Sequence, residues 1–188
     1  MNTFETFKTR KSVRTYLDRP VEGEKIAAIA KAGDMAAGTP MAGKVYFTAI
    51  GNRQLLGEIA AATKTVMGKS GVDMLVKLSS NPAYNPMYNA PAAIIVSVDK
   101  ADDPNTANMA VQNAACAAEN MLLAATDLGL GSCYLMTPTM AFAIPEVREA
   151  AKLPANTQQI CVVVFGYSED TAPHKEYPEQ PENITYIL

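Results

Sequence analysis

The sequence has few of the residues on which hydrolytic and metal-dependent enzymes usually rely. Among its 188 residues there are three cysteines and a single histidine, His174. Ser-His-Asp and Cys-His hydrolases need a histidine beside the nucleophile, and zinc sites commonly draw several ligands from His and Cys. The one histidine lies in a polar C-terminal tail, which argues against both classes, and no metal site is expected. Demanding chemistry would then have to come from a bound cofactor.

The sequence also lacks three other features: an excess of positive charge, a phosphate-binding glycine loop and an uninterrupted apolar run. The net charge is −3, which gives no electrostatic basis for nucleic-acid binding. There is no Walker A sequence, and Gly129-Leu130-Gly131 falls where a helix should end rather than begin, unlike a dinucleotide-binding turn. Polar residues interrupt every apolar window of about 20 residues, so no membrane span is expected.

The cysteines and the N-terminal segment both bear on the cellular compartment. Cys116, Cys133 and Cys161 are far apart and have apolar neighbours in the sequence. Their odd number and placement favour reduced thiols in a protein core over a disulfide. Charged residues precede any apolar run at the N-terminus, which is not typical of a secretory signal. These features predict a cytoplasmic protein.

The composition predicts one globular domain that spans residues 1–188. Apolar residues make up 48% of the chain and charged residues 19%, and no repeat or linker divides it. The last part, residues 168–188, contains three prolines and is predicted to be an extended arm. Within this arm, residues 184–188 could form an edge strand.

The longest predicted element is a helix over residues 106–128. This stretch of 23 residues has no Gly or Pro, contains eight alanines and carries only two charges, Glu119 and Asp127. A helix that is apolar nearly all round is expected to be buried. Gly129 follows at the position where a left-handed residue ends a helix, and residues 130–135 are predicted to leave it as a short strand.

Shorter elements surround this helix, and their hydrophobic periodicity identifies them. Helices are predicted over residues 3–9, 22–37, 54–67 and 146–152, and strands over residues 45–50, 92–98 and 159–165. Residues 38–43 are predicted as a loop. Residues 79–90 are predicted as an irregular loop because two Asn-Pro pairs interrupt them.

Three cations and a hydroxyl fall within five positions near the N-terminus, at Arg10, Lys11, Ser12 and Arg14. Guanidinium forks, an ammonium group and a hydroxyl donor together suit a phosphate group. The alternative is a solvated basic turn. If the segment is extended, Ser12 and Arg14 point to the same side.

Other polar residues are ambiguous. Glu119 could act as a general acid or base, or it could be paired inside the core or at a subunit contact. Tyr84 and Tyr88 could stack on a flat substrate or cover the core.

The order of the segments resembles that of the nitroreductase family of flavoproteins, and the likeness covers nearly the whole chain. The segments that carry it are Arg-Lys-Ser-Val-Arg-Thr-Tyr at 10–16, Val-Tyr-Phe at 45–47, Asn-Ala-Pro at 89–91, Leu-Gly-Leu-Gly-Ser at 128–132 and Val-Val-Val-Phe-Gly-Tyr at 162–167. The segments at 10–16 and 128–132 are more distinctive of the family together than either is separately. The resemblance implies an α+β fold with a central, mostly antiparallel sheet flanked by helices. It also implies a homodimer that binds FMN at the subunit interface and exchanges C-terminal arms.

The resemblance further assigns residues to the cofactor. The implied FMN-binding residues are Arg10, Lys11, Ser12, Arg14, Thr39, Pro40, Met41, Tyr134, Leu135, Met136 and Lys175. Residues 10–14 would hold the phosphate, the ribityl chain and the pyrimidine edge, and residues 39–41 would lie against the flavin from the second subunit. Residues 134–136 would run along the ring, with a backbone N–H near Met136 facing the flavin N5. Lys175, together with His174, takes the place of a basic phosphate ligand in the tail.

The loop before the first predicted strand departs from the family pattern. That loop usually reads Pro-Ser-x-x-Asn-x-Gln-Pro-Trp, whereas residues 37–45 here read Ala-Gly-Thr-Pro-Met-Ala-Gly-Lys-Val. The polar side chains that would contact the flavin are absent, so backbone contacts have to replace them.

The implied activity is hydride transfer from NAD(P)H through FMN to an electron-poor acceptor, a nitroaromatic compound or a quinone, by a ping-pong mechanism. Two alternatives use the same scaffold: a flavin reductase or dehalogenase-like enzyme, and a non-catalytic flavin-binding protein. An α+β interaction module without a cofactor is a third alternative.

Overall fold

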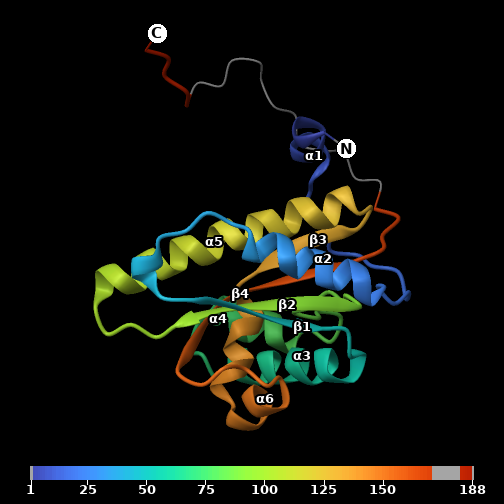
Figure 1. Cartoon of the computed structure of the whole chain (residues 1–188). Coiled ribbons are helices and arrows are strands. Elements are labelled where there is room, and N and C mark those ends of the chain that lie inside the picture. The colour runs from blue at the N-terminus through green and yellow to red at the C-terminus, as the bar shows by residue number, and fades with distance from the viewer. Residues whose placement is uncertain (1, 171–182, 188) are drawn as a thin grey trace.

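A four-stranded antiparallel sheet forms the centre of the molecule (Figure 1). The computed structural model describes residues 2–170 and 183–187. In this part of the chain the strands are β1 (Val45–Ile50), β2 (Ala92–Asp99), β3 (Gly131–Leu135) and β4 (Thr157–Gly166), in the order β1-β2-β4-β3. Every pairing is antiparallel. The predicted α+β fold with an antiparallel sheet is therefore confirmed.

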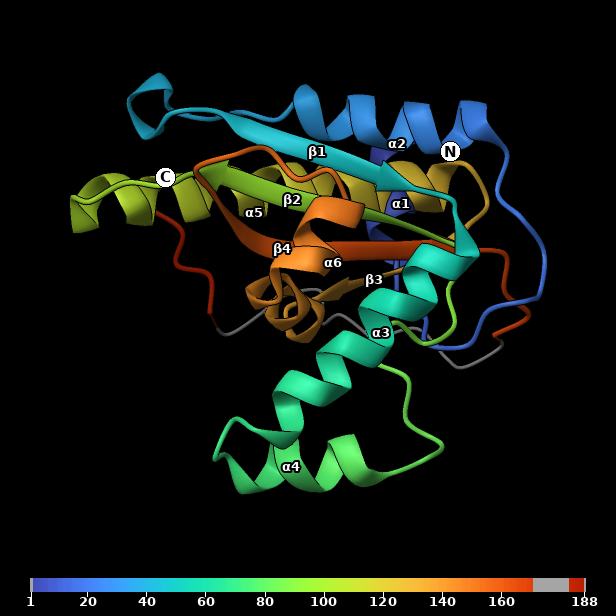
Figure 2. The same cartoon turned by 90° about the horizontal axis from the view of Figure 1, so that it is seen from below.

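Helices cover both faces of this sheet (Figures 1 and 2). On one face lie α2 (Gly23–Asp34) and α5 (Pro104–Asp127). On the other lie α3 (Arg53–Gly68), the 3₁₀ segment η2 (Thr137–Ala143) and α6 (Pro145–Ala150). The central strand β2 and residues 161–166 of its neighbour β4 are buried on both faces, which explains the apolar runs in their sequences.

Alternate side chains of these strands enter two separate hydrophobic clusters. Ile94 and Val163 belong to the cluster under α2 and α5, whereas Ile95 and Val162 belong to the cluster under α3 and η2. The alternation follows from the two-residue period of a strand. The sheet thus divides the core into two layers.

The long helix α5 covers nearly the predicted range of residues 106–128, but it begins two residues earlier and ends one residue earlier. The Asp103 carboxylate accepts a hydrogen bond from the Thr106 backbone N–H at 2.7 Å, and Pro104 occupies the first turn. Gly129 follows the helix with a φ of +74°, the left-handed conformation expected there.

The expectation that α5 is buried all round is wrong for this chain. Ala114, Ala118 and Met121 face the core, but Val111 and Cys116 are exposed on the outer face. The reason is that the sheet and α2 contact only one side of the helix. Consequently Cys133 and Cys161 are core thiols as predicted, whereas Cys116 is not; all three cysteines are free.

Two further helices extend from the layered body. The first, α1 (Thr3–Thr9), agrees with its predicted range. The second, α4 (Asp73–Ser80), was not predicted, and it projects from the body together with the end of α3 (Figure 2). None of its residues is buried, and Val72, Met74 and Val76 are exposed. The helix is only eight residues long, and a run of that length gives little periodic signal in a sequence.

Several predicted boundaries differ from the structure by a few residues. The helix predicted over residues 22–37 ends at Asp34, because Gly38 and Pro40 soon follow and a short 3₁₀ turn, η1 (Pro40–Ala42), forms in the loop. Residues 184–187 belong to no strand in this chain, and Ile187 is 95% exposed. Among the described residues, none of the helices combines the length and the hydrophobicity of a membrane span. A cytoplasmic location stays a prediction.

Candidate functional site

The basic segment after α1 runs as extended chain along the outer edge of β3. Ser12 forms a parallel bridge with Ser132, and the Val13 backbone N–H donates to the Ser132 carbonyl at 2.9 Å. Val13 is only 4% exposed, while Ser12 and Arg14 on either side of it are exposed. This alternation places Ser12 and Arg14 on the same, outward side.

A glycine in β3 allows the close approach. A Cβ built at Gly131 would lie 2.9 Å from the side-chain carbons of Val13, closer than real Cβ atoms come to their neighbours. Nearby, Ser132 is buried, and its hydroxyl has no hydrogen-bond partner among the described residues. The sequence showed the glycine but gave no sign of what packs against it.

The cations of the segment already have contacts within the chain. The Arg10 guanidinium lies 3.7 Å from the Glu119 carboxylate on α5. The Lys11 ammonium donates to the Asp170 backbone carbonyl at 2.9 Å and lies 3.5 Å from the Asp170 carboxylate. Glu119 is thus paired with a cation, but it is exposed in this chain and does not lie in the core; a subunit contact at Glu119 stays a prediction. The contact with Asp170 holds the beginning of the C-terminal tail beside the basic segment.

A cavity of about 310 Å³ lies next to this contact. Its lining residues come from the basic segment, the end of α5, the start of β3 and the tail: Thr9, Lys11, Val13, Thr126, Gly129, Leu130, Gly131, Ser168 and Asp170. Lys11 brings a positive charge to this cavity and Asp170 a negative one. Lys175 and His174, the predicted tail ligands, lie outside the described residues.

Cys133 lies close to the same segment. Burial raises the pKa of its thiol, while the positive charges of Arg14 and Arg10 and a hydrogen bond with Ser12 oppose this rise. The thiol therefore stays protonated near neutral pH and does not provide a nucleophile.

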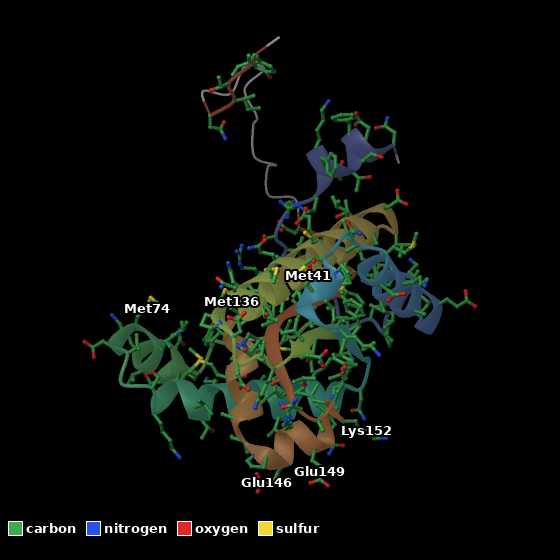
Figure 3. The ribbon with its side chains drawn as sticks, turned by 60° about the vertical axis from the view of Figure 1, so that its left-hand side comes forward. Met41, Met74, Met136, Glu146, Glu149 and Lys152 are labelled. Carbon is green, nitrogen blue, oxygen red and sulfur yellow. The ribbon has the colours of Figure 1, made fainter. Side chains whose placement is uncertain are left out.

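The residues at the end of β3 change from half-buried to exposed. Tyr134 and Leu135 are partly covered, and Met136 is 67% exposed. Burial, with Cys161 nearby, raises the pKa of Tyr134 to about 12, so its hydroxyl stays neutral at physiological pH. Figure 3 shows Met136 at the surface after β3 and Met41 on the loop before β1.

The loop that contains Thr39, Pro40 and Met41 attaches to α5 at another point. Asn113 bonds to Thr39, whereas Glu119 pairs with Arg10. Positions 113 and 119 are about 9 Å apart along the helix axis and lie on different faces of the helix. Within one chain, residues 10–14 lie beside β3, whereas residues 39–41 are attached to α5 away from that segment.

The remaining predicted candidates are the two tyrosines of the loop before β2. Tyr84 and Tyr88 contact each other edge to face, with ring centroids 6.5 Å apart, and both are half-buried. Tyr88 packs against the cluster under α3. At least part of their role is therefore to cover the core.

Comparisons with known proteins agree with this geometry. A family model described as the nitroreductase family matches residues 7–167. A relative from Archaeoglobus fulgidus, provisionally named an NADH dehydrogenase/NAD(P)H nitroreductase, is 32% identical over 166 residues, 86% of this chain and 83% of the relative. The crystal structure of a Bacteroides fragilis nitroreductase with bound FMN is 31% identical, has a TM-score of 0.87 and covers all of both chains.

A second crystal structure, of a Desulfitobacterium hafniense nitroreductase with bound FMN, has a TM-score of 0.82 over the full length of both chains. At 22% identity this likeness concerns the fold alone. The fold is thus an α+β sandwich with a basic segment on the edge of its sheet. The chain belongs to the nitroreductase family, which confirms the resemblance seen in the sequence.

Proposed function

We propose that this chain is an FMN-dependent oxidoreductase that takes a hydride from NAD(P)H and reduces an electron-poor acceptor, a nitroaromatic compound or a quinone. The observation that carries the proposal is the basic segment Arg10–Arg14, held extended on the edge of β3 in a member of this family. The FMN-bound relative at 31% identity supports the choice of cofactor.

The residues of this chain fit an FMN phosphate and ribityl chain. Ser12 and Arg14 are exposed on one side of the extended segment, and Lys11 lines the neighbouring cavity. The Ser132 hydroxyl, which has no hydrogen-bond partner among the described residues, adds a polar atom on the β3 side, and Gly131 lets the segment lie close against that strand. An ammonium group, a guanidinium fork and hydroxyls form the donor set that phosphate and polyol oxygens require.

Held by these residues, FMN would supply hydride-transfer chemistry at N5 between the nicotinamide and the acceptor. The protein needs no side-chain nucleophile for this reaction. Arg14 or Lys11 would stabilise negative charge at the pyrimidine edge, and the backbone N–H near Met136 would face N5. Because nicotinamide and acceptor would occupy the same place in turn, ping-pong kinetics are expected.

The proposed enzyme is a homodimer, with residues 1–188 as one domain and residues 168–188 as an exchanged arm. Support comes from apolar side chains that are exposed in the single chain: Phe4 and Phe7 on α1, Val111 on α5, and Ile184, Tyr186 and Ile187 near the C-terminus. Exposed apolar surface of this kind marks an interface. In the dimer, Thr39, Pro40 and Met41 would reach the flavin of the second subunit.

The absorption spectrum of the purified protein tests the proposal, before and after addition of FMN and removal of the excess. Two flavin bands that bleach anaerobically with NAD(P)H are expected, followed by turnover with menadione or a nitrofuran. Bound flavin without turnover would indicate a flavin-binding protein that is not an enzyme. A colourless protein that does not retain FMN would refute the proposal.

A further inference from the structure

The carboxamide of Asn113 binds both backbone polar groups of Thr39. Asn113 Oδ1 accepts a hydrogen bond from the Thr39 N–H at 3.0 Å, and Asn113 Nδ2 donates one to the Thr39 carbonyl at 2.9 Å. One side chain on α5 thereby orients the peptide groups on both sides of Thr39. No sequence motif marks this contact, because the two residues are 74 positions apart.

The approach of the loop to α5 depends on Gly38. A Cβ built at Gly38 would lie 2.9 Å from Asn113 Cγ, so a larger residue would push the loop away from the carboxamide. Within the loop, the Thr39 hydroxyl accepts from the Met41 N–H at 3.4 Å, and the Thr39 carbonyl also accepts from the Ala42 N–H at 3.3 Å. The polar groups of Thr39 therefore maintain the shape of the loop.

The other end of the loop is held by Asp99 at the end of β2. Its carboxylate accepts from the Lys44 backbone N–H at 2.8 Å and from the Tyr46 hydroxyl at 2.9 Å. Gly43 has a φ of +73°, and a Cβ there would lie 2.7 Å from Asp99 Oδ2. Side chains from two different elements thus fix both ends of the segment.

What the loop presents outward is apolar. Pro40 has no backbone N–H, Ala42 is buried, and the Met41 side chain is 75% exposed (Figure 3). In this chain the loop lacks the polar side chains common in the family, and the backbone groups of Thr39 are engaged with Asn113. The contact surface that remains is formed by Pro40 and Met41.

We infer that Asn113 is a positioning residue for the flavin site: by binding Thr39 it presents Pro40 and Met41 as a rigid apolar surface to the flavin of a second copy of the chain. The inference rests on the proposed function. A loop that is already ordered loses less conformational entropy on binding, and a methionine side chain adapts well to a flat ring. Asn113 would thus compensate for the missing polar contacts.

The experiment compares Asn113→Leu with Asn120→Leu in the full-length protein. Leu has the same branched shape and number of heavy atoms as Asn, and it removes both hydrogen bonds to Thr39. Asn120 is the matched control, because it lies on the same helix and its side chain donates to the Ala32 carbonyl at 3.1 Å, away from the loop. FMN affinity is measured by quenching of flavin fluorescence, and exchange of the Thr39 amide hydrogen is measured in protein without FMN.

Asn113→Leu is expected to raise the FMN dissociation constant about tenfold, and to speed exchange of the Thr39 amide by at least about tenfold. Asn120→Leu is expected to change both quantities by less than about twofold. Gly38→Ala should act in the same direction as Asn113→Leu, since its Cβ would push the loop and the Asn113 carboxamide apart. If Asn113→Leu does not fold, Asn113→Asp replaces it; Asp keeps the acceptor for the Thr39 N–H and loses the donor to the carbonyl.

Unchanged FMN affinity and unchanged Thr39 exchange in the position 113 variant would overturn the inference. Equal losses of FMN affinity in Asn113→Leu and Asn120→Leu would also overturn the inference, because they would reflect the general packing of α5. A wild-type protein that binds no FMN refutes the proposed function together with the inference. If the wild type binds FMN and the position 113 variant binds it equally well, the inference is refuted and the proposed function stands.

Discussion

Val13 lies so close to Gly131 that a β-carbon at position 131 would come within 2.9 Å of the Val13 side chain. The same contact brings the Val13 backbone N–H to the Ser132 carbonyl and keeps Ser12 and Arg14 on the outer side. A missing side chain in β3 thus determines where the basic segment lies.

Gly131→Ala should displace this segment and raise the FMN dissociation constant about tenfold, since phosphate contacts depend on well-positioned donors. Gly57→Ala is the matched control, because Gly57 lies inside α3 and a Cβ there meets no atom within 4 Å. That control should raise the free energy of unfolding by about 0.5–1 kcal/mol and leave FMN affinity unchanged. Equal FMN affinity in the two variants would contradict the role of Gly131.

Arg14→Ala should weaken FMN binding or slow flavin reduction by NAD(P)H, by about tenfold in either quantity, because a charge-assisted contact is lost. Flavin fluorescence titration and anaerobic stopped-flow absorbance measure the two effects. Arg53→Ala removes a surface arginine paired with Asp18 and should change neither. If both quantities are unchanged in Arg14→Ala, Arg14 does not belong to the site.

Ala115→Arg should convert the proposed homodimer into a monomer. Ala115 lies on the exposed face of α5 beside Cys116, where a long charged side chain would separate two apolar surfaces. Ala61→Arg introduces the same side chain at an exposed position of α3 and should leave the dimer intact. Sedimentation at micromolar concentration measures the oligomeric state of both variants. A wild-type protein that is monomeric under these conditions would refute the proposed dimer.

The contribution of Asp99 to stability should disappear at low pH. Hydrogen bonds from the Lys44 backbone N–H and the Tyr46 hydroxyl lower the pKa of its carboxyl. A carboxyl whose pKa is lower in the folded than in the unfolded state stabilises the fold above its ordinary value of about 3.9, and this stabilisation is lost as the pH falls through the folded-state pKa.

Urea unfolding of Asp99→Asn between pH 3 and pH 7 measures this effect. The variant should be less stable than the wild type at pH 7, and the difference should shrink as the pH falls below the ordinary pKa of Asp. The exposed Asp102, changed to Asn, serves as the control. A stability difference that does not depend on pH would contradict the assignment.

Arg148→Ala should destabilise the protein by about 2–3 kcal/mol. The Arg148 guanidinium donates to Gln159 Oε1 at 2.8 Å, to the Pro154 carbonyl at 2.7 Å, and to the Thr157 carbonyl and hydroxyl at 3.2 and 3.0 Å. These bonds join α6 to the start of β4, and their loss leaves partly buried acceptors without a charged donor.

Glu149→Ala, at an exposed position of the same helix (Figure 3), should change the free energy of unfolding by no more than about 0.5 kcal/mol. Chemical denaturation provides both values. A similar decrease in the free energy of unfolding of the two variants would mean that the contacts of Arg148 contribute little to stability.

Local features of the sequence predict most helices and strands of this protein and indicate the family to which it belongs. The Asp103 cap before α5, the left-handed Gly129 after it and the apolar runs within β2 and β4 depend on neighbouring residues, so they can be read along the chain. The order of the segments was enough to identify the nitroreductase family and to predict an antiparallel sheet between helices.

Only the tertiary structure decides which surfaces stay uncovered and which distant residues meet. The exposed face of α5 carries Val111, Ala115 and Cys116 among its polar residues, so the alanine-rich composition did not show that Cys116 is exposed. The contacts of Asn113 with Thr39 and of Lys11 with Asp170 join residues 74 and 159 positions apart. Such pairs depend on how the layers pack, because a hydrogen bond requires atoms within about 3 Å whatever their separation along the chain.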